Sequence, residues 1–485
     1  MIQHQASVSN QTMPPEPQFP QIIQGGMGVA VSNWTLARAV SSAGQLGVVS
    51  GTALDTVIVR RLQDGDLDGS TRRALEHFPF QDLVEYGLKT YYRPEGRGNT
   101  QAYKRLPLQV GLGDKNSRVM MALGGFVEVF LAKEGHQNPV GVNLLTKIQT
   151  HTLGTLYGAM LAGVDYVLMG AGIPRDVPGV LDKFARGETA SLKIEVTGSS
   201  ETVFMSLDPA EFGEPKPLKR PKFLPIIASN LLATMLARKA NGSIEGFIVE
   251  GPTAGGHNAP PRGQTTYDER GQPVYGERDV VDLEQLKALG LPFWLAGGAG
   301  SPQALAQALE HGAAGVQVGT LFAYSRESGL TPDIKISALE TVKTGKASIF
   351  TDPLASPTGF PFKVVEIPGT LSQDEVYQSR TRVCDLGYLR EIYQTEAGKL
   401  GFRCASEPQA LYQAKHGKLE DTTGRKCLCN SLMADVGMAQ VQRGGEVEQA
   451  LVTSGDDLLK LGSFIEKYST DYGATDVISY LLALG

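Results

Sequence analysis

Short apolar runs recur along the chain up to about residue 320, and glycine-rich turns or amphipathic stretches separate them. The first run, Ile22–Gly25, is followed by a helical pattern over Trp34–Ala43 and by a second run at Leu46–Val49. Repetition of strand, helix and strand predicts a parallel sheet with right-handed crossovers. Eight runs have the length of buried strands, and they are Ile22–Gly25, Leu46–Val49, Pro139–Leu144, Asp165–Met169, Leu224–Ala228, Gly246–Val249, Phe293–Ala296 and Gly315–Val318.

Three stretches interrupt this alternation. Residues 55–138 exceed the length of one crossover helix, and we interpret them as an insertion over the mouth of the predicted fold. Residues 186–222 contain two alternating apolar and polar runs, which predict an inserted β-hairpin. Residues 258–280 are rich in Pro, Gly and Arg without periodicity, so they predict a long loop or lid. The helical patterns of the first insertion are Asp55–Asp64, Ser70–His77 and Val119–Lys133, and the hairpin strands are Ser191–Thr197 and Thr202–Leu207.

The order of strands and helices favours a (β/α)8 TIM barrel of the α/β class, a fold of about 250 residues that tolerates insertions. A doubly wound sheet fits less well, because Gly26–Val31 lacks the third glycine of the dinucleotide-binding fingerprint. The predicted parts are an N-terminal arm at 1–20, the barrel at 21–368 with insertions near 55–138 and 186–222, and a mostly helical C-terminal extension at 369–485.

Composition narrows the class of protein. The chain of 485 residues is 41% apolar and 20% charged, as is usual for a globular protein. Its 45 Lys and Arg residues against 51 Asp and Glu residues give a net charge of −6, and no basic patch favours nucleic acid as a partner. The first twenty residues lack the apolar core of a signal peptide, and no apolar run is long enough to cross a membrane. We therefore expect a cytoplasmic protein, with its oligomeric state left open.

Two glycine-rich loops and one histidine-bearing loop follow successive predicted strands. They are Glu250–His257, Ala296–Gly300 and Gln317–Thr320. The carboxyl ends of the strands form the active site of such a barrel, and the last two loops commonly hold phosphate. Glycine lets backbone N–H groups approach a phosphate without a Cβ in between. The pattern predicts a phosphorylated cofactor with His257 beside it, and the phosphate candidates are Gly297, Gly298, Gly319 and Thr320.

Five motifs in a fixed order carry a resemblance to a known family. The chain opens with Ile22-Ile-Gln-Gly-Gly-Met-Gly28, continues with Gly141-Val-Asn143, and then presents the GGH, AGG and QVGT segments. In this order the motifs resemble the FMN-dependent nitronate monooxygenases, formerly called 2-nitropropane dioxygenases. The FMN-dependent enoyl-ACP reductases belong to the same superfamily. The resemblance covers roughly residues 20–365.

The resemblance implies FMN as the cofactor and His257 as the catalytic residue. A neutral imidazole can accept a proton, and a protonated one can stabilise negative charge on a nitro or carbonyl oxygen. Asn143 would face the edge of the flavin ring, because its amide can donate and accept hydrogen bonds. The other residues implied to contact the cofactor are Gly25, Gly26, Met27 and Gly28 against the ring, Gly255 and Gly256 beside it, and Ser229 and Glu250 at the ends of neighbouring strands.

The predicted reaction is the oxidation of a small-molecule nitronate with dioxygen, which gives a carbonyl compound and nitrite. The flavin would take its electrons directly from the nitronate. Two alternatives stay open. In the first, the enzyme uses NAD(P)H to reduce an enoyl thioester or a quinone. In the second, the chain is a flavin-binding component of a biosynthetic assembly.

The cysteines suggest a second feature. They are Cys384, Cys404, Cys427 and Cys429, all within the last quarter of the chain. Four thiolates are the ligand set of a structural zinc ion or an iron–sulfur cluster, and the charges of Arg425 and Lys426 would favour thiolate at Cys427. The spacing is irregular for a metal knuckle, so four small buried thiols without metal are the alternative.

Overall fold

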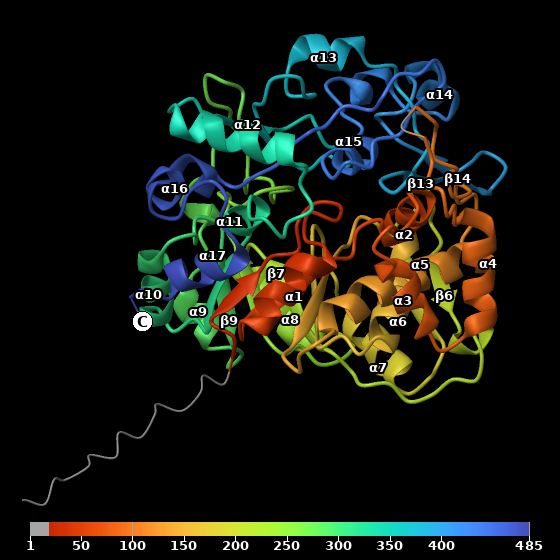
Figure 1. The fold of residues 1–485 in the computed structure, drawn as a ribbon, viewed down its shortest axis with the longest axis horizontal. Helices are drawn as coiled ribbons and strands as arrows, with labels where there is room; N and C mark the ends of the chain where they lie inside the picture. Colours follow the sequence, from red (N-terminus) through yellow and green to blue (C-terminus); the bar gives the residue numbers. More distant parts are fainter. Residues whose placement is uncertain (1–18, 99, 485) are drawn as a thin grey trace, which may run out of the picture.

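Eight parallel strands close into a barrel in the computed structural model, which describes residues 19–98 and 100–484 (Figure 1). Around the barrel their order is β1, β10, β9, β8, β7, β4, β3 and β2, and each overlaps a predicted strand. The predicted fold class is therefore confirmed. The strands are β1 (Ile22–Gln24), β2 (Leu46–Ser50), β3 (Val140–Leu145), β4 (Tyr166–Gly170), β7 (Lys222–Ile227), β8 (Phe247–Glu250), β9 (Phe293–Ala296) and β10 (Gly315–Val318).

Both faces of the barrel strands are buried. Leu168 points to the cluster that fills the barrel, whereas its neighbour Val167 packs outward against the helices. This arrangement follows because successive side chains on a strand point to opposite faces. At the amino-terminal end of the strands, Trp294 donates its Nε1–H to the carbonyl of Pro20 at 2.8 Å and meets the ring of Phe19 edge to face. Apart from these two residues, the predicted arm at 1–20 lies outside the described residues.

Helices surround the barrel, and they are α1 (Trp34–Ser42), α5 (Lys115–Lys133), α6 (Thr152–Leu161), α7 (Val177–Ala185), α8 (Asn230–Lys239), α9 (Leu283–Lys287), α10 (Pro302–Glu310) and α17 (Ala474–Leu481). Helix α5 packs against α1 and α6, so it is the crossover helix between β2 and β3 and not part of a cover over the mouth. The approach of α5 to α6 is close, because a Cβ at Gly158 would lie 1.9 Å from the carbonyl oxygen of Ala122.

The first insertion packs beside the crossover helix. It consists of α2 (Leu54–Gln63), α3 (Ser70–Glu76) and α4 (Gln81–Tyr91), which contact one another and α5. The sequence did not lead us to α4, because only Val84, Gly87 and Tyr91 of this helix are buried and their stripe is weakly apolar. The second insertion is the predicted hairpin, with β5 (Ala190–Ile194) antiparallel to β6 (Val203–Leu207).

Beyond β10 the chain forms short elements, mostly grouped on one side of the barrel (Figure 1). Helix α17 departs from this group, since it packs against α1 and α10 and so joins the ring of helices. Two antiparallel hairpins here were not predicted. The elements are α11 (Thr320–Ala323), α12 (Pro332–Lys343), β11 (Ile349–Asp352), β12 (Phe362–Val365), α13 (Asp374–Ser379), β13 (Glu391–Gln394), β14 (Leu400–Arg403), α14 (Gln409–Ala414), α15 (Leu428–Ala434) and α16 (Gly462–Tyr468).

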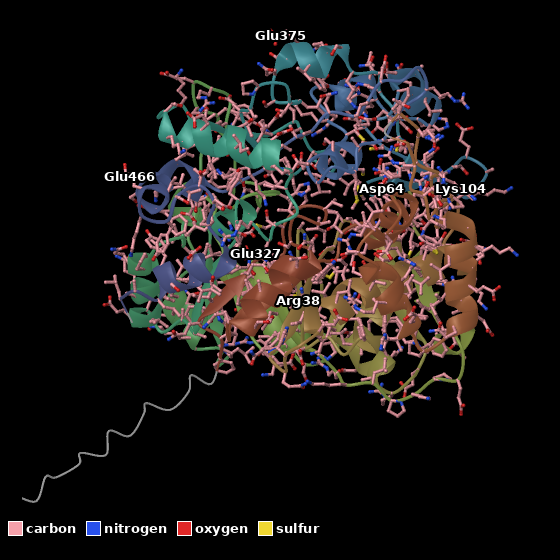
Figure 2. The ribbon with its side chains drawn as sticks, in the orientation of Figure 1. Arg38, Asp64, Lys104, Glu327, Glu375 and Glu466 are labelled. Carbon is pink, nitrogen blue, oxygen red and sulfur yellow. The ribbon has the colours of Figure 1, made fainter. Side chains whose placement is uncertain are left out.

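Charged side chains of these elements point away from the body of the protein. Glu375 on α13 and Glu466 on α16 are exposed, as Figure 2 shows. Within residues 19–98 and 100–484, no helix combines the length and the apolar character that a membrane crossing requires.

Candidate active site

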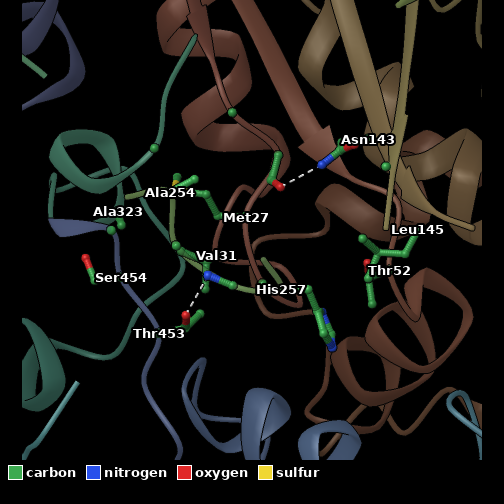
Figure 3. Close-up of a pocket in the computed structure, with 18 of the residues that line it drawn as sticks. Met27, Val31, Thr52, Asn143, Leu145, Ala254, His257, Ala323, Thr453 and Ser454 are labelled. Carbon is green, nitrogen blue, oxygen red and sulfur yellow. Dashed lines mark hydrogen bonds between the residues drawn. The ribbon is translucent and has the colours of Figure 1, made fainter. Parts of the chain in front are cut away.

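A cavity of about 210 Å³ opens at the carboxyl ends of the barrel strands (Figure 3). The structure brings every predicted catalytic and cofactor-contacting residue to this cavity except Ser229. Ser229 is instead the N-cap of α8, where its Oγ accepts from the N–H of Leu232 at 3.0 Å, and it borders a neighbouring cavity. The predicted residues that line the main cavity are Gly25, Gly26, Met27, Gly28, Asn143, Glu250, Gly255, Gly256, His257, Gly297, Gly298, Gly319 and Thr320.

The loop after β1 is held by side chains on both sides. Ser32 Oγ donates to the carbonyl of Gly25 at 2.8 Å and accepts from the N–H of Met27 at 2.9 Å. Asn143 Nδ2 donates to the carbonyl of Gly26 at 2.9 Å, and a Cβ at Gly26 would lie 2.4 Å from the Asn143 Cβ (Figure 3). Glycine is therefore required at position 26 for this contact.

Two buried amide oxygens at the cavity have no hydrogen-bond partner among the described residues. They are Asn143 Oδ1 at the end of β3 and Gln317 Oε1 within β10. Buried acceptors are almost always satisfied in folded proteins. These oxygens therefore indicate a ligand that presents hydrogen-bond donors between β3 and β10.

The loop after β9 brings two glycines to the cavity. Gly297 and Gly298 both have positive φ, at 85° and 70°, and a Cβ at Gly297 would lie 2.9 Å from the backbone N of Ala254. Beside them, Thr320 Oγ1 accepts from the N–H of Gly455 at 3.1 Å. Backbone amides and hydroxyls in a tight cluster suit an anionic group such as phosphate.

His257 lies on the cavity wall with one ring nitrogen already engaged. Its Nε2 is 2.7 Å from Ser356 Oγ, and its ring meets the Phe362 ring edge to face at 4.9 Å between centroids. Burial lowers the pKa of His257 to about 4, since desolvation penalises the charged imidazolium. The imidazole is therefore neutral near neutral pH.

Glu250 stands at the end of β8, where it borders both the main cavity and a second cavity of about 150 Å³. Arg262 and Tyr275, from the predicted loop at 258–280, form part of the wall of that second cavity. Burial raises the pKa of Glu250 to about 8, and the described residues offer its carboxyl group no hydrogen bond. Near neutral pH the group is mainly a neutral carboxylic acid, which can donate a proton.

The far wall of the cavity comes from the C-terminal extension, for which the sequence predicts no residue at the cofactor. Thr453 Oγ1 accepts from the N–H of Gly256 at 2.8 Å (Figure 3), and Asp457 accepts from the N–H of Gly300 at 3.0 Å. The extension residues that line the cavity are Tyr388, Leu389, Leu428, Cys429, Leu432, Asp435, Thr453, Ser454, Gly455 and Asp457. The only local sequence pattern here that is typical of a ligand-binding loop is the glycine-bearing turn Thr453–Gly455. The residues next to Tyr388 and Leu432 in the sequence form no such motif.

The cavity has little positive charge. Among the described residues that line it there is no Lys or Arg, whereas Glu250, Asp435 and Asp457 contribute carboxyl groups. Burial raises the pKa of all three, and for Asp435 it does so strongly. At Glu250, where the raised pKa is about 8, the wall therefore carries less negative charge near neutral pH than an exposed carboxyl group would give.

The predicted metal site is not supported. The described residues contain no group of three or more His, Cys, Asp or Glu side chains arranged to hold a metal ion. Cys404 Sγ contacts Ser406 Oγ at 3.1 Å, Cys427 accepts from Asn430 at 3.7 Å, and Cys429 belongs to the apolar cavity wall.

The expected activation of Cys427 was also wrong. Burial raises its pKa to about 11, so the thiol stays protonated near neutral pH. The two cationic residues before Cys427 bind other groups. Arg425 donates to main-chain carbonyls, and Lys426 pairs with Asp352 at 3.2 Å. All four cysteines, Cys384 included, are free thiols.

Comparison with known proteins agrees with the motifs. Residues 183–348, which contain His257 and β7 to β10, match the family model of nitronate monooxygenase. No curated protein matches the sequence of this chain.

Several solved structures are similar in outline. FabK from Thermotoga maritima has 18% sequence identity and a TM-score of 0.46, over 96% of this chain and 93% of that chain. A nitroalkane oxidase from Streptomyces ansochromogenes has 15% identity and a TM-score of 0.46, over 96% and 95%. The enoyl reductase domain of MlnA, from the macrolactin biosynthesis cluster of Bacillus amyloliquefaciens, has 10% identity and a TM-score of 0.49, over 97% of each chain. At these TM-scores the likenesses carry no inference about the reaction.

Proposed function

We propose that this chain, an FMN-dependent oxidoreductase similar to the nitronate monooxygenases, oxidises nitronates with dioxygen to carbonyl compounds and nitrite. One observation carries the proposal. The segment that matches the family model, residues 183–348, supplies His257, Glu250 and the loops after β9 and β10, and all of them line one cavity. Two nitronates and one dioxygen give two carbonyl compounds and two nitrites, so the balance needs no external reductant.

The residues at the cavity fit FMN. The unpartnered oxygens of Asn143 and Gln317 can accept from the donors of a flavin ring or its ribityl chain. Gly297 and Gly298, both with positive φ, would present backbone N–H groups to the phosphate, and Ser454 of the same cavity wall would add a hydroxyl. When bound, FMN supplies the redox chemistry: it accepts electrons from the substrate and passes them to dioxygen.

His257 has a defined part in this proposal. A nitronate is already deprotonated and carries its negative charge on the nitro oxygens. A neutral imidazole can donate one N–H to such an oxygen. Because the pKa of His257 is lowered to about 4, the same group is a weak base for the α-proton of a neutral nitroalkane. The proposed substrate is therefore the nitronate anion and not the nitroalkane.

One observation favours a second candidate, the NAD(P)H-dependent reduction of an enoyl thioester or quinone. Such a reduction needs a proton as well as a hydride. Glu250, with a pKa raised to about 8, faces the cavity as a neutral acid that could supply the proton.

Anaerobic stopped-flow mixing tests the two candidates directly. The FMN-loaded protein is mixed in separate runs with a nitronate, NADH and NADPH while flavin absorbance is followed. The proposal expects rapid bleaching by the nitronate and slow bleaching by either nicotinamide. Rapid reduction by NADPH with none by nitronates would replace the proposal with the reductase.

A further inference from the structure

Ser356 is buried behind His257, on the turn between β11 and β12, outside the barrel strands. It is fully inaccessible to solvent, and its Oγ is 2.7 Å from His257 Nε2. The main chain is joined at the same place, because His257 forms an isolated antiparallel bridge with Phe362 of β12. The hairpin therefore supports both the backbone and the ring of the histidine.

The hydrogen bonds around Ser356 favour one direction for its own hydrogen. Ser356 Oγ accepts from the Thr358 N–H at 3.2 Å and lies 2.8 Å from Thr358 Oγ1. Within the described residues, the Thr358 hydroxyl has no other acceptor than Ser356. Thr358 can therefore donate to Ser356 through both its N–H and its hydroxyl, an arrangement that leaves the Ser356 hydrogen for His257 Nε2.

We infer that Ser356 is a positioning residue that holds His257 in the Nδ1–H tautomer. A neutral imidazole has one N–H, and a nitrogen that accepts a hydrogen bond cannot carry it. With Nε2 accepting from Ser356, the hydrogen lies on Nδ1, which makes no hydrogen bond with the described residues. Nδ1–H is then the donor that His257 offers to a substrate. The role of Nδ1–H as a donor to the substrate rests on the proposed function. The assignment of the tautomer is independent of it.

The C-terminal extension holds the turn that carries Ser356. Arg425 Nη1 donates to the carbonyl of Ser356 at 2.6 Å and to that of Leu354 at 2.8 Å. The adjacent N–H of Lys426 donates to the carbonyl of Ala355 at 2.8 Å. Three successive carbonyls of the turn are thus bound by two residues of the extension. Contacts in the extension therefore reach the catalytic histidine through one hydroxyl group.

The test is ¹⁵N NMR of selectively histidine-labelled, FMN-loaded protein, in which protonated and unprotonated ring nitrogens give separate resonances. His257 is assigned by its loss in His257→Gln. We expect a single Nδ1–H tautomer in the native protein. In Ser356→Ala we expect both tautomers, with FMN content retained and kcat lowered about 10-fold while KM changes less.

Two further variants separate a positioning role from general damage. Arg425→Met keeps the aliphatic stem but removes the donors to the turn, so it should broaden the His257 resonances and lower kcat about 3-fold. Ser379→Ala is the matched control, because Ser379 is exposed and its hydroxyl donates only to the carbonyl of Val376 at 3.0 Å. It should change neither readout.

The outcomes are distinguishable from those of the proposed function. An Nε2–H tautomer in the native protein, or an unchanged tautomer in Ser356→Ala, overturns the inference even if nitronates reduce the flavin. Loss of the single tautomer in Ser356→Ala supports the inference even if nitronates do not react.

Discussion

The two walls of the cavity are built differently. The barrel wall includes the loops after β1, β3, β8, β9 and β10, and it offers backbone amides, glycines, His257 and Glu250. The extension wall consists of the residues from Tyr388 to Asp457 that line the cavity, and it offers apolar side chains, hydroxyls and carboxyl groups. Backbone groups recognise features that any bound FMN presents, whereas side chains shape the remaining space. We therefore expect damage to the barrel wall to affect cofactor and chemistry, and damage to the extension wall to affect substrate choice.

The largest effect should come from the barrel wall at His257. Replacing it in His257→Gln removes the N–H donor, and we expect turnover to fall about 100-fold or more while FMN stays bound. Steady-state kinetics with a nitronate and the flavin spectrum provide the two readouts. His311→Gln is the control, because His311 is exposed and contacts only the carbonyl of Gln307 at 2.7 Å. Equal turnover in the two variants would show that His257 does not contribute to the chemical step.

The next effect should appear in cofactor affinity. In Gly297→Ala, the new Cβ would lie 2.9 Å from Ala254 N at a φ of 85°, so the loop must shift. We expect FMN affinity, measured by fluorescence titration, to fall about 10- to 100-fold. Gly290→Ala carries similar backbone strain at a φ of 72°, but its Cβ would meet nothing within 4 Å. If both variants bind FMN like the native protein, the loop after β9 does not hold the phosphate.

Glu250 should make stability depend on pH. Its pKa is raised to about 8 in the folded protein, so between its unfolded value and about 8 the folded state binds the extra proton. The contribution of this proton to the free energy of unfolding is fully present below the pKa of Glu250 in the unfolded chain. It is lost as pH rises from that value to about 8, by up to about 1.4 kcal/mol per pH unit.

Removal of the carboxyl group should flatten this dependence. Glu250→Gln and an exposed control, Glu76→Gln, are compared by urea unfolding at pH 5, 7 and 9. Relative to the native protein, Glu250→Gln should gain stability toward alkaline pH, and the control should not. A parallel pH dependence in all three proteins would mean that Glu250 ionises as an exposed residue does.

The smallest effect should come from the extension wall. Leu432 of α15 lines the cavity, and Leu432→Ala makes room for a longer substrate. One additional buried methylene is worth about 0.8 kcal/mol, so kcat/KM for the nitronate of a longer nitroalkane should rise about 4-fold relative to that for a short one. Leu411→Ala, at a side chain 46% exposed on α14, is the control. If Leu432→Ala changes FMN affinity and leaves substrate preference unchanged, the extension wall contributes to cofactor binding and not to substrate choice.

Much of the barrel wall follows from short stretches of sequence. An apolar run such as Leu46–Val49 and a glycine-rich loop such as Ala296–Gly300 carry their signal within a few residues, and all eight strands lie where such runs occur. The hairpin at β5 and β6 was predicted for the same reason, because alternation is a local pattern. Ser229 follows a predicted strand, and this position alone led to its prediction as a cofactor contact. A serine at such a position is also a favourable N-cap, and in the structure Ser229 caps α8.

The extension wall was decided by tertiary structure. Ser356 lies 99 residues from His257 in the chain, and Thr453 lies 197 residues from Gly256, so no local pattern connects either pair. The cysteines show the opposite error, because four thiols in the last quarter of the sequence suggested a metal, whereas the described residues contain no group of three or more His, Cys, Asp or Glu side chains arranged to hold one. Strands and glycine turns depend on backbone preferences that each segment carries by itself. The partners of a side chain depend on which distant segments the closed barrel brings to its mouth.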